Sequence, residues 1–525
     1  MDAIEIHASL KLSESMSQQS KSLRQKVIIF LLLIFSVCIW TYYPEAQEHI
    51  LILHWNDFHA QNLPILEKVN GSWVKVGGAA TLKAYIEKLK AEGLPTAIVH
   101  AGDEFQGTPI STITKGKSQI ELLNLFDIDV MTLGNHEFDY GRDVLQQRLK
   151  EAQFPIISAN IFDKRNAKLF VSPYYIEKIG KVKIGFIGLI TKELPFLTLP
   201  RNVAGLKILS PEMTARQYIH LLKDSVDVIV VVSHMGIAAD RRLAQKVAGI
   251  DVIIGGHSHT VLTTPELVNG TIICQAGSHG RYLGRVDLWV DTLKDTVLSF
   301  KGQLIPTVVE NILPDSVVLA KVQKLEQEVD RELNVVIGTL ERDWVRNSRG
   351  ESNIGNWLAD VMRDYAQADV AFQNSGGIRK DLKAGPITKR DIWEIAPFSN
   401  HFVVFEVTGS ELKSILEHNI SGRGSFLQTS GVEVEYDPGR PRGQRILSVK
   451  VKGRVLQSER KYLVVANNYM TENFYRIFHL PPHNRNFRSL PKLDRDVFIE
   501  AVQQQRVLDG KLKRRYHAVS TRGRW

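Results

Sequence analysis

Short apolar runs rich in β-branched residues, each followed directly by a polar motif, recur through the first half of the chain. Helix-like stretches separate the runs, and this alternation is typical of an α/β domain with buried strands. The five runs that end in polar motifs are ILILH (50–54), TAIVHA (96–101), IDVMTLG (128–134), DVIVVVS (227–233) and DVIIGG (251–256). The carboxyl ends of neighbouring strands in such a sheet converge on one crevice, the usual ligand site. The pattern therefore predicts one site built from five separate segments.

The motifs at these strand ends carry metal-ligand chemistry. We expect a mixed set of nitrogen and oxygen donors to meet in the crevice: Asp57, His59, Asp103, Asn135, His234, His257 and His259. Such a set suits two hard or borderline divalent ions such as Zn²⁺, Mn²⁺ or Co²⁺, and Asp103 could bridge them. Each histidine taken alone would more often be a hydrogen-bonded core or surface residue, but five motifs at five strand ends favour a metal site. The set contains no thiolate, which argues against a structural zinc site.

Two divalent ions held about 4 Å apart are a standard means of in-line phosphoryl displacement. The ions activate water and stabilise both the attacking and the leaving oxygen. The strand-end motifs therefore predict a metal-dependent hydrolase that acts on phosphoesters.

A charged amphipathic stretch divides the chain into two parts. Residues 314–333, PDSVVLAKVQKLEQEVDREL, contain no turn signal and predict a helix that connects two domains. A second α/β pattern begins after this helix and continues to about residue 508. We expect an N-terminal tail and hydrophobic anchor at 1–48, a first α/β domain at 49–312, a linker helix at 313–336, a second α/β domain at 337–508 and a basic tail at 509–525.

The net charge of +9 is concentrated near the C-terminus, where residues 506–525 hold seven Lys or Arg against one Asp. A basic tail of this kind can contact anionic lipid or nucleic acid. We expect instead a solvated and poorly ordered end. Since the rest of the chain is close to neutral, the charge does not indicate a nucleic-acid enzyme, and no nucleic-acid partner is expected.

The N-terminal segment VIIFLLLIFSVCIW (27–40) is apolar, unbroken by charge and preceded by Lys21, Arg24 and Lys26. Extended to residue 43 it reaches the lower length limit of a membrane span. Basic residues before it and acidic ones after it place the body of the protein on the periplasmic or extracellular face. No Ala-x-Ala cleavage site follows the segment, which favours a signal anchor over a cleaved signal peptide. The chain has only Cys38 and Cys274, too few to hold a domain together by disulfides.

The motifs NDFH, GDEFQG, GNHEFD, SHMG and GHSH, in this order, resemble the calcineurin-like metallophosphoesterases. That resemblance implies a four-layered α/β/β/α sandwich with a dinuclear metal site. After the predicted linker helix, ESNIGNWLAD, NSGGIR and APFSN resemble the C-terminal substrate domain of the 5′-nucleotidase family. The two resemblances together cover about residues 49–470.

The resemblance also implies roles for single residues. The first metal would be held by Asp57, His59, Asp103 and His259, and the second by Asp103, Asn135, His234 and His257. His136 and Asp139 would form a catalytic dyad in which the imidazolium meets the charge on the phosphoryl group. Asn374 and Arg379 would face the substrate, and Phe398 would stack on the base. An arginine before ESNIGN is also expected, and Arg349 fits best, with Arg346 as the alternative.

One segment departs from the family pattern. Family members usually carry a glycine-rich loop before a second base-stacking aromatic, but VVANNYMTENFYRIF (464–478) has no such loop. The second aromatic is therefore unassigned, with Phe474 and Tyr475 as candidates. We expect the set of metal ligands to be complete and the residues that recognise the nucleotide to differ from the family pattern.

The sequence thus predicts an exported or membrane-anchored dinuclear phosphohydrolase that acts on nucleoside 5′-phosphates. One alternative keeps the fold and acts on nucleotide-sugar pyrophosphates, 2′,3′-cyclic nucleotides or sulfur esters. Another is a non-catalytic surface-binding protein that retains the fold. Oligomeric state and metal identity stay open.

Overall fold

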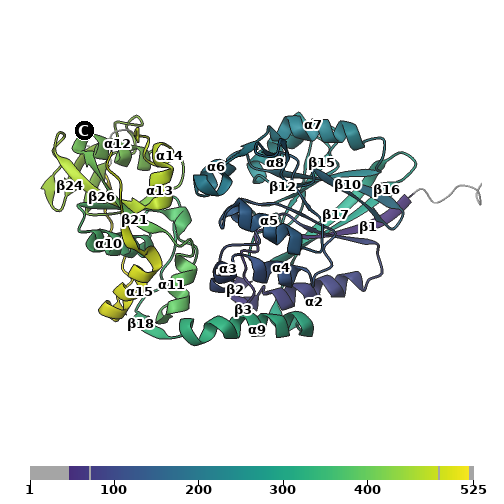
Figure 1. The fold of residues 1–525 in the computed structure, drawn as a ribbon, viewed down its shortest axis with the longest axis horizontal. Helices are drawn as coiled ribbons and strands as arrows, with labels where there is room; N and C mark the ends of the chain where they lie inside the picture. The colour runs from purple at the N-terminus through teal and green to yellow at the C-terminus, as the bar shows by residue number, and fades with distance from the viewer. Residues whose placement is uncertain (1–46, 70–71, 483–484, 520–525) are drawn as a thin grey trace, which may run out of the picture.

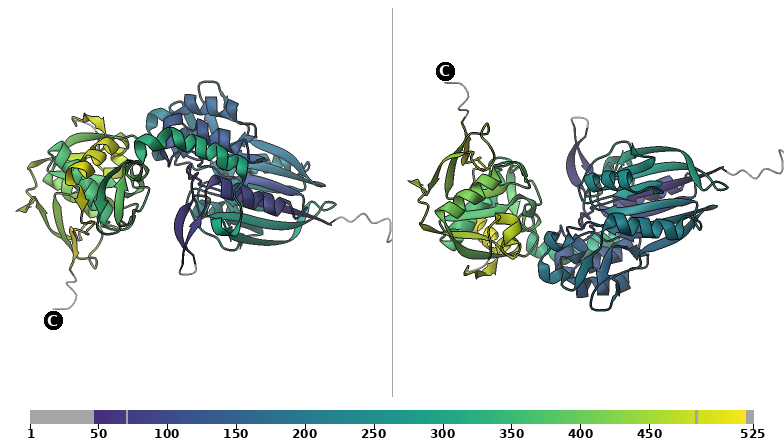
Figure 2. Two further views of the ribbon diagram at one scale, coloured as in Figure 1. Left: turned by 90° about the horizontal axis from the view of Figure 1, so that it is seen from below. Right: turned by 90° about the horizontal axis from the view of Figure 1, so that it is seen from above.

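The computed structural model describes residues 47–69, 72–482 and 485–519. Two α/β domains lie side by side, and a long helix runs along one edge of the molecule and connects them (Figure 1). This helix is α9 (Ser316–Leu333). The views from below and above show the same two separate bodies (Figure 2).

Two six-stranded sheets form the centre of the N-terminal domain. The first has the order β17-β16-β1-β4-β5-β6 and the second β14-β15-β13-β12-β10-β9. The strands of the first are β1 (Gln47–Trp55), β4 (Thr96–His100), β5 (Val130–Thr132), β6 (Ile156–Ile157), β16 (Tyr282–Asp291) and β17 (Thr296–Pro306). Those of the second are β9 (Tyr174–Ile179), β10 (Val182–Ile190), β12 (Val228–His234), β13 (Val252–Gly255), β14 (Glu266–Val268) and β15 (Thr271–Gln275). All five strand runs predicted to end in polar motifs are present.

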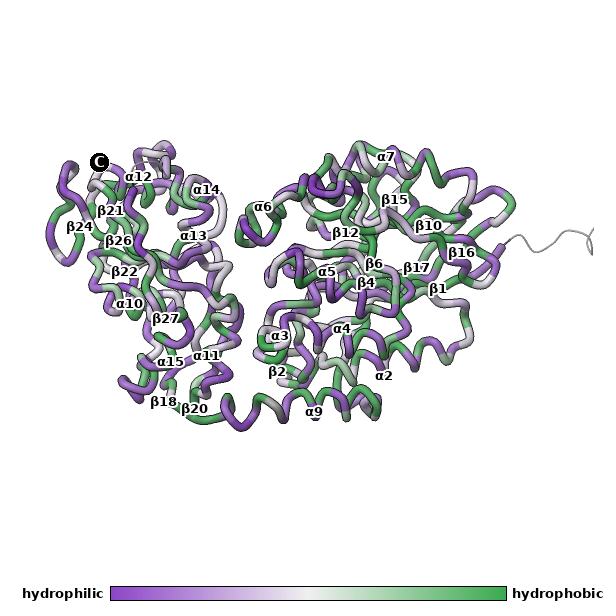
Figure 3. The backbone as a smooth tube through the Cα atoms, viewed as in Figure 1, coloured by the Kyte–Doolittle hydropathy of each residue, from purple (hydrophilic) through white to green (hydrophobic). Residues whose placement is uncertain are grey.

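Alternation along the strands produces four layers. Ile50 and Ile52 of β1 point into a core shared with Val230 and Ile254 of the second sheet. Their neighbours in the sequence face outward to helices, because successive side chains of a strand point to opposite faces. The outer helices on the two sides are α2 (Ala79–Lys90), α3 (Pro109–Thr114), α4 (Lys117–Leu123), α5 (Arg142–Glu151), α7 (Pro211–Leu222) and α8 (Ile237–Lys246). The predicted α/β/β/α sandwich is confirmed, and the hydropathy colouring shows apolar strands at its centre (Figure 3).

The predicted linker helix belongs physically to the first domain. Val318, Val322 and Leu325 of α9 are buried in the same cluster as Leu82 and Ile86 of α2. The apolar face of α9 therefore extends the outer helix layer.

The C-terminal domain is built on a five-stranded sheet of order β22-β19-β26-β21-β27. Its strands are β19 (Val370–Asn374), β21 (His401–Thr408), β22 (Leu427–Ser430), β26 (Lys461–Asn467) and β27 (Arg488–Leu493). The helices of this domain are α10 (Asn353–Ala366), α11 (Lys389–Ile395), α12 (Gly409–Asn419), α13 (Asn468–Glu472), α14 (Phe474–Phe478) and α15 (Asp494–Gln505). Smaller sheets add β18 (Val336–Leu340), β20 (Gly385–Thr388), β28 (Val507–Leu508), β23 (Val432–Tyr436), β24 (Ile446–Val451), β25 (Arg454–Val455) and β29 (Tyr516–Ala518). The predicted second α/β domain is confirmed.

Residues 515–518 of the basic tail are held against the C-terminal domain, so the prediction of a solvated, poorly ordered end is wrong for this part. Strand β29 pairs in parallel with β23, with Tyr516 opposite Val434. Arg515 is buried and forms an ion pair with Asp360 of α10 at 2.5 Å. Backbone N–H groups of Arg515 and Tyr516 donate to Glu351. A count of basic residues could not reveal these partners, because each lies far away in the sequence.

The predicted anchor at 27–43 and Cys38 lie outside the described residues. Within the described ranges, helix length and hydropathy together give no candidate for a membrane span. Cys274 is buried in β15, and burial raises the pKa of its thiol.

The candidate metal centre and active site

Several of the predicted ligands sit in an unusual backbone conformation. Asp57, His59, Asp103, His257 and His259 have φ values of 50°, 53°, 59°, 76° and 53°. The left-handed region is sparsely populated by residues other than glycine and is enriched at functional sites. Each of these residues comes just after a strand, where the backbone leaves the sheet and turns its side chain into the crevice.

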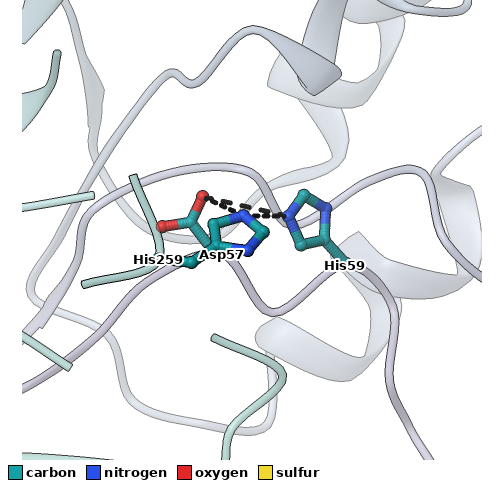
Figure 4. Close-up of side chains that lie close together, drawn as sticks. All are labelled: Asp57, His59 and His259. Atoms are coloured by element: carbon teal, nitrogen blue, oxygen red, sulfur yellow. Dashed lines mark hydrogen bonds and ion pairs between the residues drawn. The ribbon is translucent and has the colours of Figure 1, made fainter. Parts of the chain in front are cut away.

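Asp57, His59 and His259 form a first group of possible metal ligands (Figure 4). The Nε2 atoms of the two histidines are 3.0 Å apart. Asp57 Oδ1 lies 3.3 Å from Nε2 of His259 and 3.8 Å from Nε2 of His59. The three side chains come from the ends of β1 and β13, which belong to different sheets.

Asp103, His234 and His257 form a second group next to the first. His234 Nε2 lies 3.0 Å from Asp103 Oδ2 and 4.0 Å from Asp57 Oδ1, so the two groups adjoin. Asn135 is also buried. The residue after it, His136, donates its backbone N–H to Oδ1 of Asp103.

The donor atoms of these groups fit a bound cation. Asn135 Oδ1 is buried and has no hydrogen-bond partner within the described ranges, while Asp57 Oδ1 and His234 Nε2 are buried and contact only other residues of the two ligand groups. Unpartnered buried polar atoms are costly unless something else satisfies them. Their convergence is therefore what a divalent ion requires.

Hydrogen bonds on the far side of the rings orient the histidine lone pairs. Nδ1–H of His59 donates to the carbonyl of Gln106 at 3.2 Å, and Nδ1–H of His234 donates to that of Ala101 at 2.7 Å. Such bonds to carbonyls fix the tautomer of metal-binding histidines and leave the lone pair on Nε2. Burial, with the charge of Arg379, holds the pKa of His59 well below its usual value and keeps it neutral.

The carboxylates create a negative field at this point. Burial opposes a charge on His234, yet Asp103 and Asp57 raise its pKa to about 10. The two carboxylates thus favour positive charge beside Nε2, which a divalent ion would supply.

His136 and Asp139 are in direct contact. Nδ1 of His136 lies 2.5 Å from Oδ2 of Asp139, and Nε2 lies 4.0 Å from Oδ2 of Asp103. Burial opposes protonation, but Asp139 and Asp103 raise the pKa of His136 above its ordinary value. The geometry therefore supports an imidazolium at the edge of the metal-ligand groups. His136 also lies close enough to His59 and Asp103 to count as a third candidate ligand group, but its Nδ1 is committed to Asp139.

A cavity of about 550 Å³ opens over these residues and is lined by both domains. The N-terminal domain contributes Asp103, Asn135, His136, Asp139, His257 and His259. The C-terminal domain contributes Asn374, Gly376, Gly377, Arg379, Phe398 and Tyr469. The cavity thus joins the ligand groups to a second set of side chains suited to holding a substrate.

Comparison with known proteins agrees with this arrangement. The calcineurin-like phosphoesterase family matches residues 50–261, and the 5′-nucleotidase C-terminal domain matches residues 336–478. Human 5′-nucleotidase is 31% identical over 500 residues, covering 84% of this chain and 85% of the human protein. The snake venom 5′-nucleotidase of Crotalus adamanteus is 30% identical over 465 residues, covering 77% of this chain and 76% of the venom protein. This chain belongs to the 5′-nucleotidase family.

A solved structure extends the agreement to the whole fold. The 5′-nucleotidase precursor from Thermus thermophilus has a TM-score of 0.82 at 29% identity, covering 90% of this chain and 99% of that one. Family membership confirms the predicted metal-dependent phosphoester hydrolase, and the family uses divalent metal ions.

In this 5′-nucleotidase-family protein, the residues expected to face a substrate are only partly brought together. Nη2 of Arg379 donates to Nε2 of His59 at 3.3 Å, and its guanidinium lies 5.8 Å from the centre of the Phe398 ring. The ring of Phe398 is stacked against that of His136, and the two ring centres are 5.8 Å apart. Asn374 lines the cavity beside them.

Arg349 and the alternative, Arg346, are both exposed and neither lines the cavity, but Arg346 lies beside Arg379. Nη1 of Arg346 donates to the carbonyl of Arg379 at 2.7 Å, and its Nε donates to Asp381. Of the two arginines, Arg346 is thus the one in contact with Arg379, and a substrate role for either stays a prediction.

Neither predicted candidate for the second aromatic faces the cavity. Phe474 is buried against Phe405 in the core, and Tyr475 is 67% exposed. Tyr469 lines the cavity instead, and its hydroxyl donates to the carbonyl of Phe196 in the other domain. It follows directly on the end of a buried strand, the same signal that located the metal ligands, so the sequence could have indicated it.

Glu137 is a structural residue that motif reading left undefined. Its buried carboxylate accepts backbone N–H groups from Gly134 at 2.6 Å, Asp103 at 3.0 Å, Glu104 at 2.7 Å and Phe105 at 3.2 Å. These bonds fix the Asp103 loop against the loop that carries Asn135.

Proposed function

We propose that this enzyme hydrolyses nucleoside 5′-phosphates in the cavity between its domains, with two divalent ions bound. The observation that carries the proposal is the single cavity that joins two adjacent ligand groups to Asn374, Arg379 and Phe398. The relatives named 5′-nucleotidase, at 30–31% identity over most of the chain, support it.

In this proposal Asp57, His59, Asp103 and His259 hold the first ion, and Asp103, Asn135, His234 and His257 hold the second. Bound divalent ions activate water and neutralise charge on phosphoryl oxygens. Zn²⁺, Mn²⁺ and Co²⁺ all suit the donors.

The chain's own residues bind and orient the substrate. His136, held protonated by Asp139, places positive charge next to the phosphoryl group. Arg379 is suited to bidentate capture of phosphate oxygens. Phe398 provides a flat apolar face for the base, and stacking on such a face is worth about 1–3 kcal/mol.

Export is a further part of the proposal. The apolar segment at 27–43, with basic residues before it, supports a signal anchor that holds the enzyme at the periplasmic or extracellular face. The domain limits of 49–312 and 337–508, separated by the linker at 313–336, are proposed on the same sequence patterns.

One observation favours a second candidate function. Lys115 and Arg201 line the same cavity as the ligand groups and could meet a second phosphate. Nucleotide-sugar pyrophosphates are therefore the alternative substrate class.

A substrate panel tests the proposal. The full-length protein, reconstituted separately with Mn²⁺, Co²⁺ and Zn²⁺, is assayed on AMP, UDP-glucose, a 2′,3′-cyclic nucleotide and an aryl phosphate. Preference for AMP supports the proposal, and preference for UDP-glucose supports the second candidate. Inactivity on every substrate with every metal contradicts both.

A further inference from the structure

Asn467, the last residue of β26, is buried and caps the helix that carries Tyr469. Its side-chain Oδ1 accepts the backbone N–H of Met470 at 3.0 Å. A backbone N–H can only donate, so this bond fixes the orientation of the Asn467 amide. The oxygen faces α13, and the nitrogen must face the other way.

That nitrogen determines the orientation of a second amide. Nδ2 of Asn467 donates to Oδ1 of Asn374 at 2.8 Å. Nε2 of Gln373 lies 3.5 Å from the same Oδ1, so a second donor faces this oxygen. Asn374 therefore has its oxygen committed inside the domain, and its Nδ2 remains available as a donor.

Asn374 lies where the orientation of its side-chain amide would affect a bound substrate. Asn374 lines the cavity together with Gly376 and Gly377. A Cβ on Gly377 would come within 2.8 Å of Gln373 Nε2 and within 3.0–3.2 Å of the Asn374 amide, so the bare glycine leaves room for both amides. A donor at this point suits an acceptor such as a phosphate or ribose oxygen.

We propose that Asn467 is a positioning residue: it fixes Asn374 as a hydrogen-bond donor toward an oxygen of the substrate. The chain of hydrogen bonds begins at the backbone N–H of Met470, which can only donate. It continues through the side-chain amides of Asn467 and Asn374 and ends at the cavity. This inference rests on the proposed function, because the substrate role of Asn374 is part of it.

The exchange Asn467→Asp tests the orientation while preserving shape. The aspartate still accepts from Met470 and keeps the cap, but it cannot donate to Asn374. The Asn374 amide then turns its nitrogen toward the aspartate and its oxygen toward the substrate. We expect kcat/KM for AMP in the metal-reconstituted protein to fall about 10- to 100-fold, the size of a lost hydrogen bond to a charged group.

Asn419→Asp is the matched control. Asn419 is also a buried asparagine whose Oδ1 accepts a backbone N–H, from Leu427, and whose Nδ2 donates, to the Tyr516 hydroxyl. It is not among the cavity residues. We expect this variant to lose thermal stability and to keep kcat/KM within about twofold.

A double-mutant cycle separates positioning from a general structural role. In an Asn374→Ala background, Asn467→Asp should have no further effect on kcat/KM, because the group that it orients is gone. Additive losses, or an unchanged kcat/KM in Asn467→Asp alone, would overturn the inference and leave the proposed function standing. A wild-type protein that neither hydrolyses AMP nor binds it in calorimetry would overturn both.

Discussion

Adjacent residues of the GNHEFD motif have separate environments. Asn135 leaves a buried side-chain oxygen without a partner among the described residues, His136 contacts Asp139 on the cavity side, and Glu137 binds four backbone N–H groups. At the residue scale, three neighbouring side chains thus suit metal binding, charge stabilisation and loop support.

These environments predict different outcomes for two alanine variants. His136→Ala should keep the metal content of wild type and lower kcat for AMP about 100- to 1,000-fold, the range for removing one charge-stabilising group. Asn135→Ala should lower metal occupancy, because it removes an oxygen that we propose as a ligand. Metal analysis by mass spectrometry and steady-state kinetics measure both effects. Loss of metal in His136→Ala would assign that residue to the ligands instead.

Asp240 of α8, which bonds to Ser233 next to the proposed ligand His234, gives a pH prediction. It is fully buried, and although Ser233 donates to its Oδ1 at 2.5 Å, its Oδ2 has no hydrogen-bond partner within the described ranges. Burial raises its pKa to about 7, so the folded state binds a proton there that the unfolded chain releases near pH 4. The free energy of unfolding of the wild-type protein, compared with that of Asp240→Asn, should therefore fall as pH rises from about 4 to about 7. Above about pH 7 the difference should stay constant.

Urea unfolding of the metal-loaded protein at several pH values measures this difference. Asp224→Asn, at an exposed carboxylate next to a lysine, serves as the control and should show no such trend. A stability difference independent of pH in Asp240→Asn would show that Asp240 is ionised throughout.

At the scale of elements, the final strand changes the interpretation of the basic tail. Strand β29 extends a sheet, and Arg515 ties it to α10 through Asp360. The tail thus stabilises the segment that begins with Glu351 and leads into α10.

Arg515→Ala should lower the free energy of unfolding of the C-terminal domain by about 2–4 kcal/mol, because it removes the ion-pair partner of the partly buried Asp360 and leaves only the bond from Ser430. Arg514→Ala is the matched control, since Arg514 is exposed, and it should change stability by less than about 0.5 kcal/mol. Chemical denaturation measures both. Equal effects of the two variants would mean that the tail contributes only through its net charge.

For the whole molecule, contacts across the cavity join the domains on the side opposite α9. Arg476 of α14 donates to Glu193 at 2.9 Å and to the carbonyl of Phe196 in α6 (Leu194–Leu197). Arg201 lies 3.2 Å from Glu472 of α13. These exposed ion pairs are individually weak, so substrate could enter when they separate and the domains rotate.

Charge reversal tests this idea of domain opening. Arg476→Glu places like charges at the contact with Glu193, and we expect KM for AMP to rise severalfold because the closed arrangement is disfavoured. Adding Glu193→Arg restores the opposite charges and should recover most of the wild-type KM. Steady-state kinetics at low and high salt measure the effect, which salt should weaken. A double variant no better than Arg476→Glu would show that the ion pair does not control closure.

The sequence by itself predicted an α/β domain from its strand-like runs, the α/β/β/α sandwich from its motif resemblance, and one crevice for the seven proposed ligands. The crevice follows from a local pattern, because parallel strands end together at one edge of a sheet. The His136–Asp139 pair was predicted instead from the motif resemblance, and both residues lie in the loop after β5.

Only the tertiary structure decided how residues of the second domain are placed around the cavity. The contact of the Tyr469 hydroxyl with Phe196, the bond from Arg346 to Arg379, and the amide chain from Met470 to Asn374 depend on contacts between distant segments. Arg515 likewise pairs with a residue 155 positions away. Spacing in the sequence fixes which way a side chain leaves its own strand or helix, whereas the packing of separate elements decides what it meets.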